Sequence, residues 1–222
     1  MTRFGGIRYD QYVVLRLLPV PASSALLGRH DELDALAARV LEGDAVGVRT
    51  FVTAVGPHLL RGVRRVLGPN HPEVEDVTQE AAFAVIGALR SYRGEASIVH
   101  FACRIAVQTA VKVRRREATL KRRQIGEAVD PDLIVGAGAD PDVEAEARAS
   151  AQLVRELIAT LPEPQAEALA LHCVLGFTVS EIALTAGLPL ETVRSRLRLA
   201  KNALRKQART TPGLSAWVEE TG

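Results

Sequence analysis

The sequence is poor in the residues that build disulfide frameworks and aromatic cores. Its 222 residues include two cysteines and one tryptophan, and aromatic residues make up 4% of the chain. Cys103 and Cys173 do not have CxxC spacing, so no disulfide framework is indicated and a reducing, cytosolic compartment is the default. With so few aromatic side chains, the core must be built from alanine, valine and leucine, which is typical of helical proteins.

Signals for membrane insertion and for catalysis are also missing. No apolar run approaches the roughly 18 to 20 residues of a membrane span. Arg16 and Pro19 interrupt the apolar N-terminal stretch, so residues 1–30 are expected to be a poorly ordered extension and not a signal peptide. The chain has no glycine-rich phosphate loop, no nucleophile elbow and no clustered carboxylates with a base. We therefore predict no enzymatic activity, no cofactor, no small-molecule substrate and no direct membrane insertion.

Two pairs of histidine and cysteine residues are candidate metal ligands. His100 and Cys103 lie one helical turn apart, and His172 is adjacent to Cys173. A zinc site needs about four converging ligands, and these pairs fall in what we expect to be separate domains. We interpret both cysteines as buried packing residues and predict no metal site.

The distribution of charge is uneven, although the net charge is only +2. Residues 194–209 contain no acidic side chain, and residues 127–146 are acidic. A second basic block at residues 104–123 has Glu117 as its one acid against Arg104, Lys112, Arg114, Arg115, Arg116, Lys121, Arg122 and Arg123. Two basic blocks around an acidic spacer suggest two surfaces that face a polyanion.

Helical periodicity dominates the chain, and no strand pattern survives inspection. We predict a first domain at 31–123, an acidic linker at 124–142 that is rich in glycine and proline, a second domain at 143–209 and a tail at 210–222. The fold class is therefore all-α, with two small helical domains joined by a flexible linker.

Within the first domain, the apolar spacing predicts four helical segments. The first ends at Gly43, and in the second Pro57 should kink the helix or separate it from the next turn. Residues 73–90 form an amphipathic helix with acidic and amide side chains outward; its expected inward residues are Val74, Val77, Ala81, Ala84 and Ala88. The loop SYRGEAS then leads into a long helix from about Ile98 to Arg116 or beyond.

The second domain carries the clearest local motif. Helical stripes up to Leu161 and from Pro164 to Gly176 precede a capping box formed by Thr178 and Glu181. A short helix, a glycine turn at Gly187 and a longer helix after Pro189 make a helix-turn-helix arrangement, whose second helix enters the DNA major groove.

The residues of that longer helix fall into two stripes. Leu190, Val193, Leu197, Ala200 and Leu204 form an apolar face, and Arg194, Arg198, Lys201 and Arg205 follow about 100° round the helix. Residues that could reach base edges or phosphates are Glu191, Thr192, Arg194, Ser195 and Arg198, and the later cations suit phosphate. An ordinary helical hairpin with a solvated basic face is the simpler alternative.

Both halves resemble the extracytoplasmic-function (ECF) sigma factors of the RNA polymerase sigma-70 family. LPEPQAEALALHCVLGFTVSEIALTAGLPLETVRSRLRLAKNALRK is similar to the σ4 helix-turn-helix domain, and EDVTQEAAFAVIGALRSYRGEASIVHFACRIA is similar to the σ2 helical bundle. The resemblance covers roughly residues 44–206, in the order that the family has.

The resemblance implies roles for residues of the first domain. Asp76, Gln79 and Glu80 would dock on the β′ clamp helices of core RNA polymerase. Recognition and melting of the −10 element would use Arg93, Gly94, Glu95, Phe101, Arg104, Lys112, Arg114 and Arg115. The free-energy cost of extruding a base can be offset by a pocket for the base, by stacking and by cations that contact the backbone.

The resemblance also implies partners. The second domain would read the −35 element with the residues named above from Glu191 to Arg205 and would meet the β flap of the polymerase. The acidic linker would run through the polymerase channels. An anti-sigma protein would hold the free factor inactive, and the protein would work in the bacterial cytoplasm at the nucleoid.

Three departures from the family pattern concern the −10 region. Phe101 stands where the family usually has tryptophan, Val107-Gln108 where it often has Arg-Asn, and Lys112 at a commonly acidic position. They put the −10 specificity in doubt and not the fold.

Two other functions remain open at this point. A one-component helix-turn-helix regulator would share the C-terminal motif but would need a sensor domain instead of the DVTQE helix and the first basic block. A helical interaction module without DNA contacts would leave both cation stripes unexplained.

Overall fold

The computed structural model describes residues 30–124, 152 and 154–210, and within these ranges the chain is helical with connecting turns and no strand. Most of the predicted extension, linker and tail lies outside the described residues, as does the predicted stripe at Val143, Ala147 and Ala151. None of the helices in the described ranges has the length and apolar character needed to cross a bilayer.

The first half is a bundle built around one long helix. Its elements are α2 (His30–Leu41), α3 (Ala45–Leu67), α4 (Val74–Ala88), the short 3₁₀ turn η3 (Leu89–Ser91) and α5 (Ile98–Gln124). The helix α5 packs against both α3 and α4, and the side chains of Phe51, Leu59 and Ile98 are completely buried between them. The long helix expected from Ile98 is therefore present.

The helix α3 runs through Pro57 without a break. Asp44 caps its start by accepting a hydrogen bond from the Val46 N–H at 2.9 Å. The expectation that Pro57 could separate two helices is wrong: proline removes one backbone donor, but buried residues on both sides of it, such as Val55 and Leu59, hold the turns in one continuous helix.

The inward face of α4 differs from the predicted one mainly at Ala84. Val74, Val77 and Ala81 are buried as expected and Ala88 is half-buried, but Ala84 is exposed and Val85 is buried in its place. Ala84 lies 300° round the helix from Ala81, 60° short of a full turn, whereas Val85 lies 400° from it, 40° past a full turn, and so stays closer to the buried stripe.

The second half places a helix-turn-helix on a two-helix support. After a helical segment at 154–160 come α7 (Glu163–Leu169), the π-helical turn η4 (Ala170–Val174), α8 (Val179–Ala186) and α9 (Leu190–Thr210). The capping box is present: the Glu181 N–H donates to Thr178 Oγ1 at 3.1 Å, and the Thr178 N–H donates to Glu181 Oε2 at 2.7 Å. Gly187 ends α8 with the predicted positive φ, 62°.

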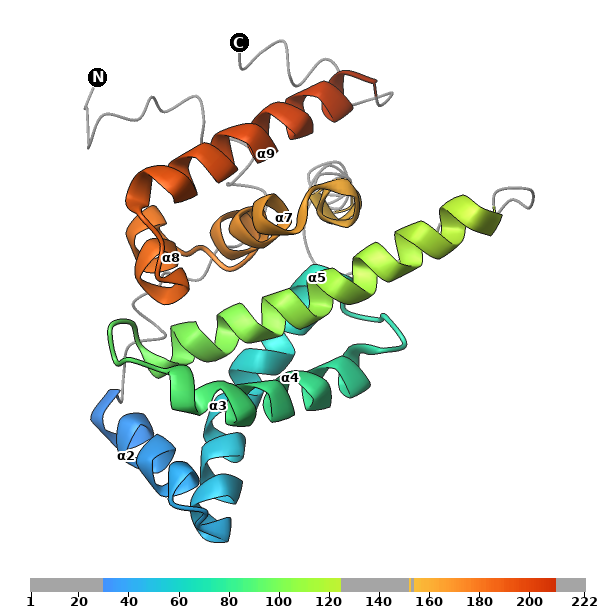
Figure 1. Ribbon diagram of the computed structural model, residues 1–222. Helices are drawn as coiled ribbons and strands as arrows, with labels where there is room; N and C mark the ends of the chain where they lie inside the picture. The colour runs from blue at the N-terminus through green and yellow to red at the C-terminus, as the bar shows by residue number, and fades with distance from the viewer. Residues whose placement is uncertain (1–29, 125–151, 153, 211–222) are drawn as a thin grey trace, which may run out of the picture.

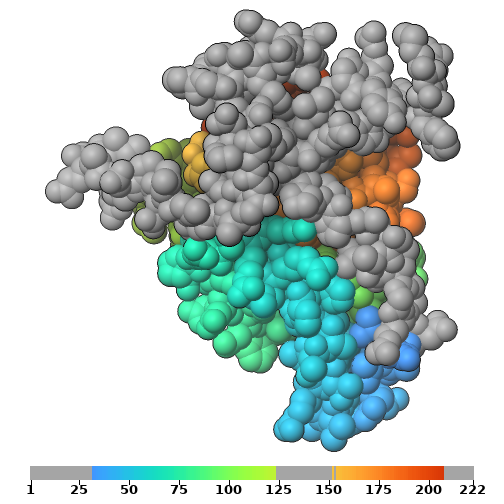
Figure 2. Space-filling view, turned by 180° about the vertical axis from the view of Figure 1, so that it is seen from behind, coloured from blue at the N-terminus to red at the C-terminus, as the bar shows by residue number. Residues whose placement is uncertain are grey.

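The two halves touch each other. In Figure 1, α7 and α8 lie between α5 and α9, and residues of α7, η4 and α8 contact α5. Seen from behind in Figure 2, α2 and α3 form the end of the molecule that is remote from α8. The sequence suggested two separate cationic bodies, and in this structure the second half instead rests on the cationic helix of the first.

We expect Thr178→Ala to lower the free energy of unfolding by about 1 kcal/mol, because it removes the side-chain acceptor at the N-terminus of α8. Chemical denaturation monitored by circular dichroism measures the change. Thr178→Ser is the matched control and should stay within about 0.5 kcal/mol of the parent, since serine caps as well as threonine. Equal stability of all three proteins would contradict the capping role.

Candidate nucleic-acid and polymerase interfaces

The direction of the cations on α9 is set by burial of its apolar stripe. Val193, Leu197, Ala200 and Leu204 are buried against the rest of the second half. Because α9 packs on α7 and α8 through this stripe, the neighbouring stripe must face away from the protein. Among its members, Arg194, Arg198 and Arg205 are exposed and Lys201 is half-buried.

The first turns of α9 combine cations with polar side chains. Glu191 is exposed, and Thr192 and Ser195 are half-buried beside it. The Arg194 guanidinium forms an ion pair with the Glu191 carboxylate one turn earlier. Arg194 is therefore held along the surface of the helix.

The support below α9 is apolar and fixed by one histidine. His172 Nδ1 lies 2.8 Å from the Phe177 carbonyl oxygen, which requires the ring proton on Nδ1. Burial lowers the pKa of His172, so the ring stays neutral at physiological pH. Burial raises the pKa of the adjacent Cys173 to about 11, which is consistent with the predicted packing role of this cysteine.

One face of α4 is exposed and acidic. Asp76, Gln79 and Glu80 all point to solvent on the side opposite the buried stripe. Phe83 lies on the same side, three residues after Glu80, and its side chain is 73% exposed. A phenylalanine so open to water beside carboxylates suggests a surface that is covered by a partner.

The sequence reasoning missed Phe83. The available signal was its helical spacing from Gln79 and Glu80 in a chain with few aromatic residues. This spacing did not indicate an exposed surface residue, because the adjacent Ala84 was predicted to be buried.

The loop before α5 is exposed, whereas the aromatic residue that follows it is not. Arg93, Gly94 and Glu95 are exposed, and Gly94 has a φ of 73°. Phe101 is only 9% exposed, and the centroid of its ring lies 5.2 Å from that of Tyr92. Burial and the nearby Asp34 carboxylate raise the pKa of Tyr92 to about 12.

Of the four α5 cations assigned to the −10 element, Lys112 is exposed, and the other three have carboxylate partners. Arg104 Nε lies 2.6 Å from Glu167 Oε1, and Arg115 Nη1 lies 3.6 Å from Glu163 Oε2, both carboxylates coming from α7. Arg114 Nη1 lies 3.7 Å from Glu117 Oε2 within α5.

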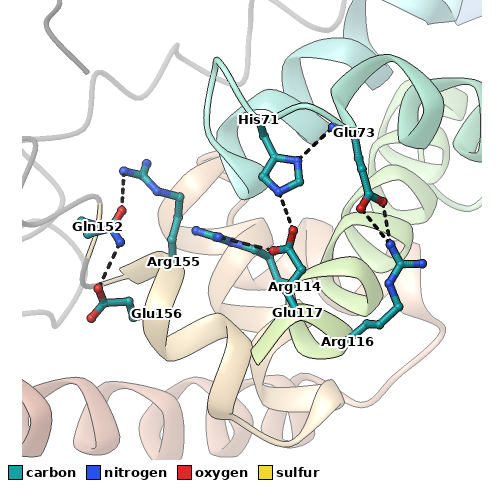
Figure 3. Close-up of polar contacts among 8 residues, drawn as sticks. All are labelled: His71, Glu73, Arg114, Arg116, Glu117, Gln152, Arg155 and Glu156. Atoms are coloured by element: carbon teal, nitrogen blue, oxygen red, sulfur yellow. Dashed lines mark hydrogen bonds and ion pairs between the residues drawn. The ribbon is translucent and has the colours of Figure 1, made fainter. Parts of the chain in front are cut away.

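The far end of α5 is part of a polar cluster, which Figure 3 shows. His71 Nε2 lies 2.7 Å from Glu117 Oε1, and Arg116 donates to Glu73 at 2.6 Å, so the turn before α4 is tied to α5. Arg155, from the segment before α7, lies beside Arg114 on the other side of the cluster. Burial lowers the pKa of both guanidinium groups, and each keeps a carboxylate nearby.

Comparison with known proteins shows to which family the chain belongs. Residues 51–119 match the family of sigma-70 region 2, and residues 151–204 match the family of sigma-70, region 4. The chain is 30% identical over 190 residues to the ECF RNA polymerase sigma factor ShbA of Streptomyces griseus, an alignment that covers 81% of this chain and 98% of the relative. The chain belongs to the ECF sigma factors of the sigma-70 family.

Two further relatives of this sigma factor align over more than half of its length. The RNA polymerase sigma-H factor of Pseudomonas aeruginosa is 31% identical over 139 residues, which are 60% of this chain and 72% of the relative. The ECF RNA polymerase sigma-E factor of Escherichia coli is 28% identical over 174 residues, 76% of this chain and 90% of the relative. As a sigma factor, the protein binds core RNA polymerase and promoter DNA and directs promoter-specific initiation, a role that involves no catalysis of its own.

Proposed function

We propose that this sigma factor divides its work among three surfaces. The exposed face of α4 binds the β′ clamp helices of core RNA polymerase, the loop 93–95 with α5 recognises and melts the −10 element, and α9 reads the −35 element as duplex. The single observation that carries the proposal is the outward cation stripe on α9, the second helix of the helix-turn-helix, in a chain that also has an exposed acidic face on α4.

The chemistry of α4 suits a protein partner better than DNA. Asp76 and Glu80 would repel phosphates, and Phe83 supplies an apolar side chain that gains by leaving water. Gln79 can donate and accept hydrogen bonds in the same contact. Phe83 therefore joins the three residues identified from the sequence as a proposed polymerase contact.

The proposed −10 surface combines a loop for bases with cations for the backbone. Arg93, Gly94 and Glu95 would shape the pocket for an extruded base, with Phe101 and Tyr92 forming its apolar floor. Arg104, Lys112, Arg114 and Arg115 all lie on α5 and would hold the phosphates of the single strand. Stacking on the half-buried Tyr92 replaces stacking within the duplex.

The proposed −35 surface runs from Glu191 to Arg205 on α9. Glu191, Thr192, Arg194, Ser195 and Arg198 would approach base edges, and Lys201 and Arg205 would hold phosphates. A guanidinium matches the O6 and N7 acceptors of guanine with two hydrogen bonds, which suits Arg194 and Arg198.

The remaining partners rest on family membership. The second half would meet the β flap of the polymerase, and an anti-sigma protein would hold the free factor inactive. The protein would act in the cytoplasm at the nucleoid, where the polymerase and its promoters are located.

Run-off transcription with core RNA polymerase and a pool of genomic fragments tests the function directly. Adding the protein should produce discrete transcripts that core polymerase alone does not make. A one-component regulator would add none, because it brings no initiation activity to core polymerase. Absence of any new transcript over the pool would reject the proposed function.

Phe83→Ser should weaken binding to core RNA polymerase about tenfold, the effect typical of an aromatic side chain in an interface. Fluorescence anisotropy of the labelled protein, titrated with core polymerase, measures the affinity. Leu120→Ser is the matched control, because Leu120 is an exposed apolar residue on α5, outside the proposed contact. If both variants bound core polymerase with the affinity of the parent, the proposed role of α4 would be contradicted.

Arg194→Ala and Arg198→Ala should each reduce −35 recognition by about 1–3 kcal/mol and leave core binding unchanged. The measurement compares transcription from a recovered promoter with that from its −35 mutant. Arg49→Ala removes an exposed cation from α3 and should have no effect on either property. Equal losses of promoter recognition and core binding would contradict the division of labour.

A further inference from the structure

The start of α4 is held by a histidine and not by the side chain of its own N-cap. In the described part of the chain, the N-cap residue Glu73 makes no side-chain hydrogen bond to the first turn of α4. His71 supplies two acceptors instead. Its Nδ1 accepts from the Glu73 N–H at 3.2 Å, and its carbonyl oxygen accepts from the Val74 N–H at 3.2 Å. Both donors are backbone groups that the start of a helix leaves without intrahelical partners.

The same histidine ring ties this turn to α5. His71 Nε2 lies 2.7 Å from Glu117 Oε1, as Figure 3 shows, and the histidine side chain is 12% exposed. Because Nδ1 already accepts a hydrogen bond, the ring proton lies on Nε2, where it donates to Glu117. Only the neutral Nε2–H tautomer satisfies both contacts. His71 therefore bridges the backbone at the start of α4 and a carboxylate of α5.

Charged groups of α5 fix both ends of this bridge. The second oxygen of Glu117, Oε2, lies 3.7 Å from Arg114 Nη1, so the carboxylate is held from both sides. Arg116 donates to both carboxylate oxygens of Glu73, at 2.9 and 2.6 Å. The start of α4 thus meets α5 through two links, and the link through His71 is the less exposed of the two.

The first turn of α4 carries part of the proposed polymerase contact. Asp76 belongs to this turn, three residues after the N-cap, and is exposed. Phe83 lies about two turns further on, where the buried Ala81 and Val85 hold the helix against the bundle. Helix ends fray when their terminal groups lack partners, so loss of the bridge should disorder Asp76 more than Phe83.

We propose that His71 is a positioning residue for polymerase binding: it holds the first turn of α4 in the orientation in which Asp76 meets the clamp helices. This inference rests on the proposed function, in which α4 binds core RNA polymerase. A turn that is already ordered loses less conformational freedom when it binds. The bridge therefore raises the affinity for core polymerase without touching the partner itself.

The test measures binding of the labelled full-length protein to core RNA polymerase by fluorescence anisotropy. His71→Ala removes both contacts of the ring. His71→Asn keeps an acceptor for the Glu73 N–H, in the manner of an Asx-turn, but is too short to reach Glu117. Arg39→Ala is the matched control, because it breaks an ion pair with Asp44 at the turn between α2 and α3. Circular dichroism at the assay temperature verifies folding, and if His71→Ala does not fold, His71→Asn decides the test.

We expect His71→Ala to bind core polymerase about fivefold more weakly than the parent and His71→Asn about twofold more weakly, whereas Arg39→Ala should match the parent. A second measurement combines His71→Ala with changes in α4. Added to Asp76→Ala, it should cost less than about twofold further, since the side chain that it positions is gone. Added to Phe83→Ser, it should still cost about fivefold. A residue that only stabilises the fold would not produce this difference.

Equal affinity of the folded His71 variants and Arg39→Ala for core polymerase would overturn the proposal. The same would follow if His71→Ala cost as much in the Asp76→Ala background as in the Phe83→Ser background. Failure of the proposed function would look different: Phe83→Ser would bind core polymerase like the parent, or the run-off assay would yield no new transcript.

Discussion

The ion pair between Arg104 and Glu167 is the interaction on which the arrangement of this sigma factor depends. It joins the central helix of the first half to the support of the helix-turn-helix, with the carboxylate almost fully removed from water. A buried carboxylate is tolerated only where donors converge on it, and here α5 supplies two. The helix α5 thus serves at once as core, as proposed DNA surface and as the site where the second half rests.

The orientation of the cations on α9 has a simpler cause. Its apolar stripe is buried on α7 and α8, and this burial alone turns Arg194, Arg198 and Arg205 away from the protein. Neither half covers these side chains in the structure. The two proposed DNA surfaces therefore differ in accessibility. The arginines of α9 are exposed, whereas cations of α5 are paired with carboxylates of the same chain.

Features that depend on neighbouring residues were predictable from the sequence. The capping box at Thr178, the positive φ of Gly187 and the two stripes of α9 all follow from local spacing. Features that depend on tertiary packing were not: the burial of Val85 instead of Ala84, the exposure of Phe83 and the position of α7 on α5. Glu167 reads in the sequence as an ordinary helical residue, because nothing in its local pattern shows that Arg104 lies opposite.

Footprinting of one promoter complex tests the central claim most directly, since it reports on both DNA surfaces in the same molecule. With core polymerase and this protein, the account predicts two results on one promoter: duplex protection around −35, and thymines near −10 that react with permanganate because they are unpaired. Protection of a single duplex segment with no reactive thymine, or reactive thymines that core polymerase produces alone, would contradict it.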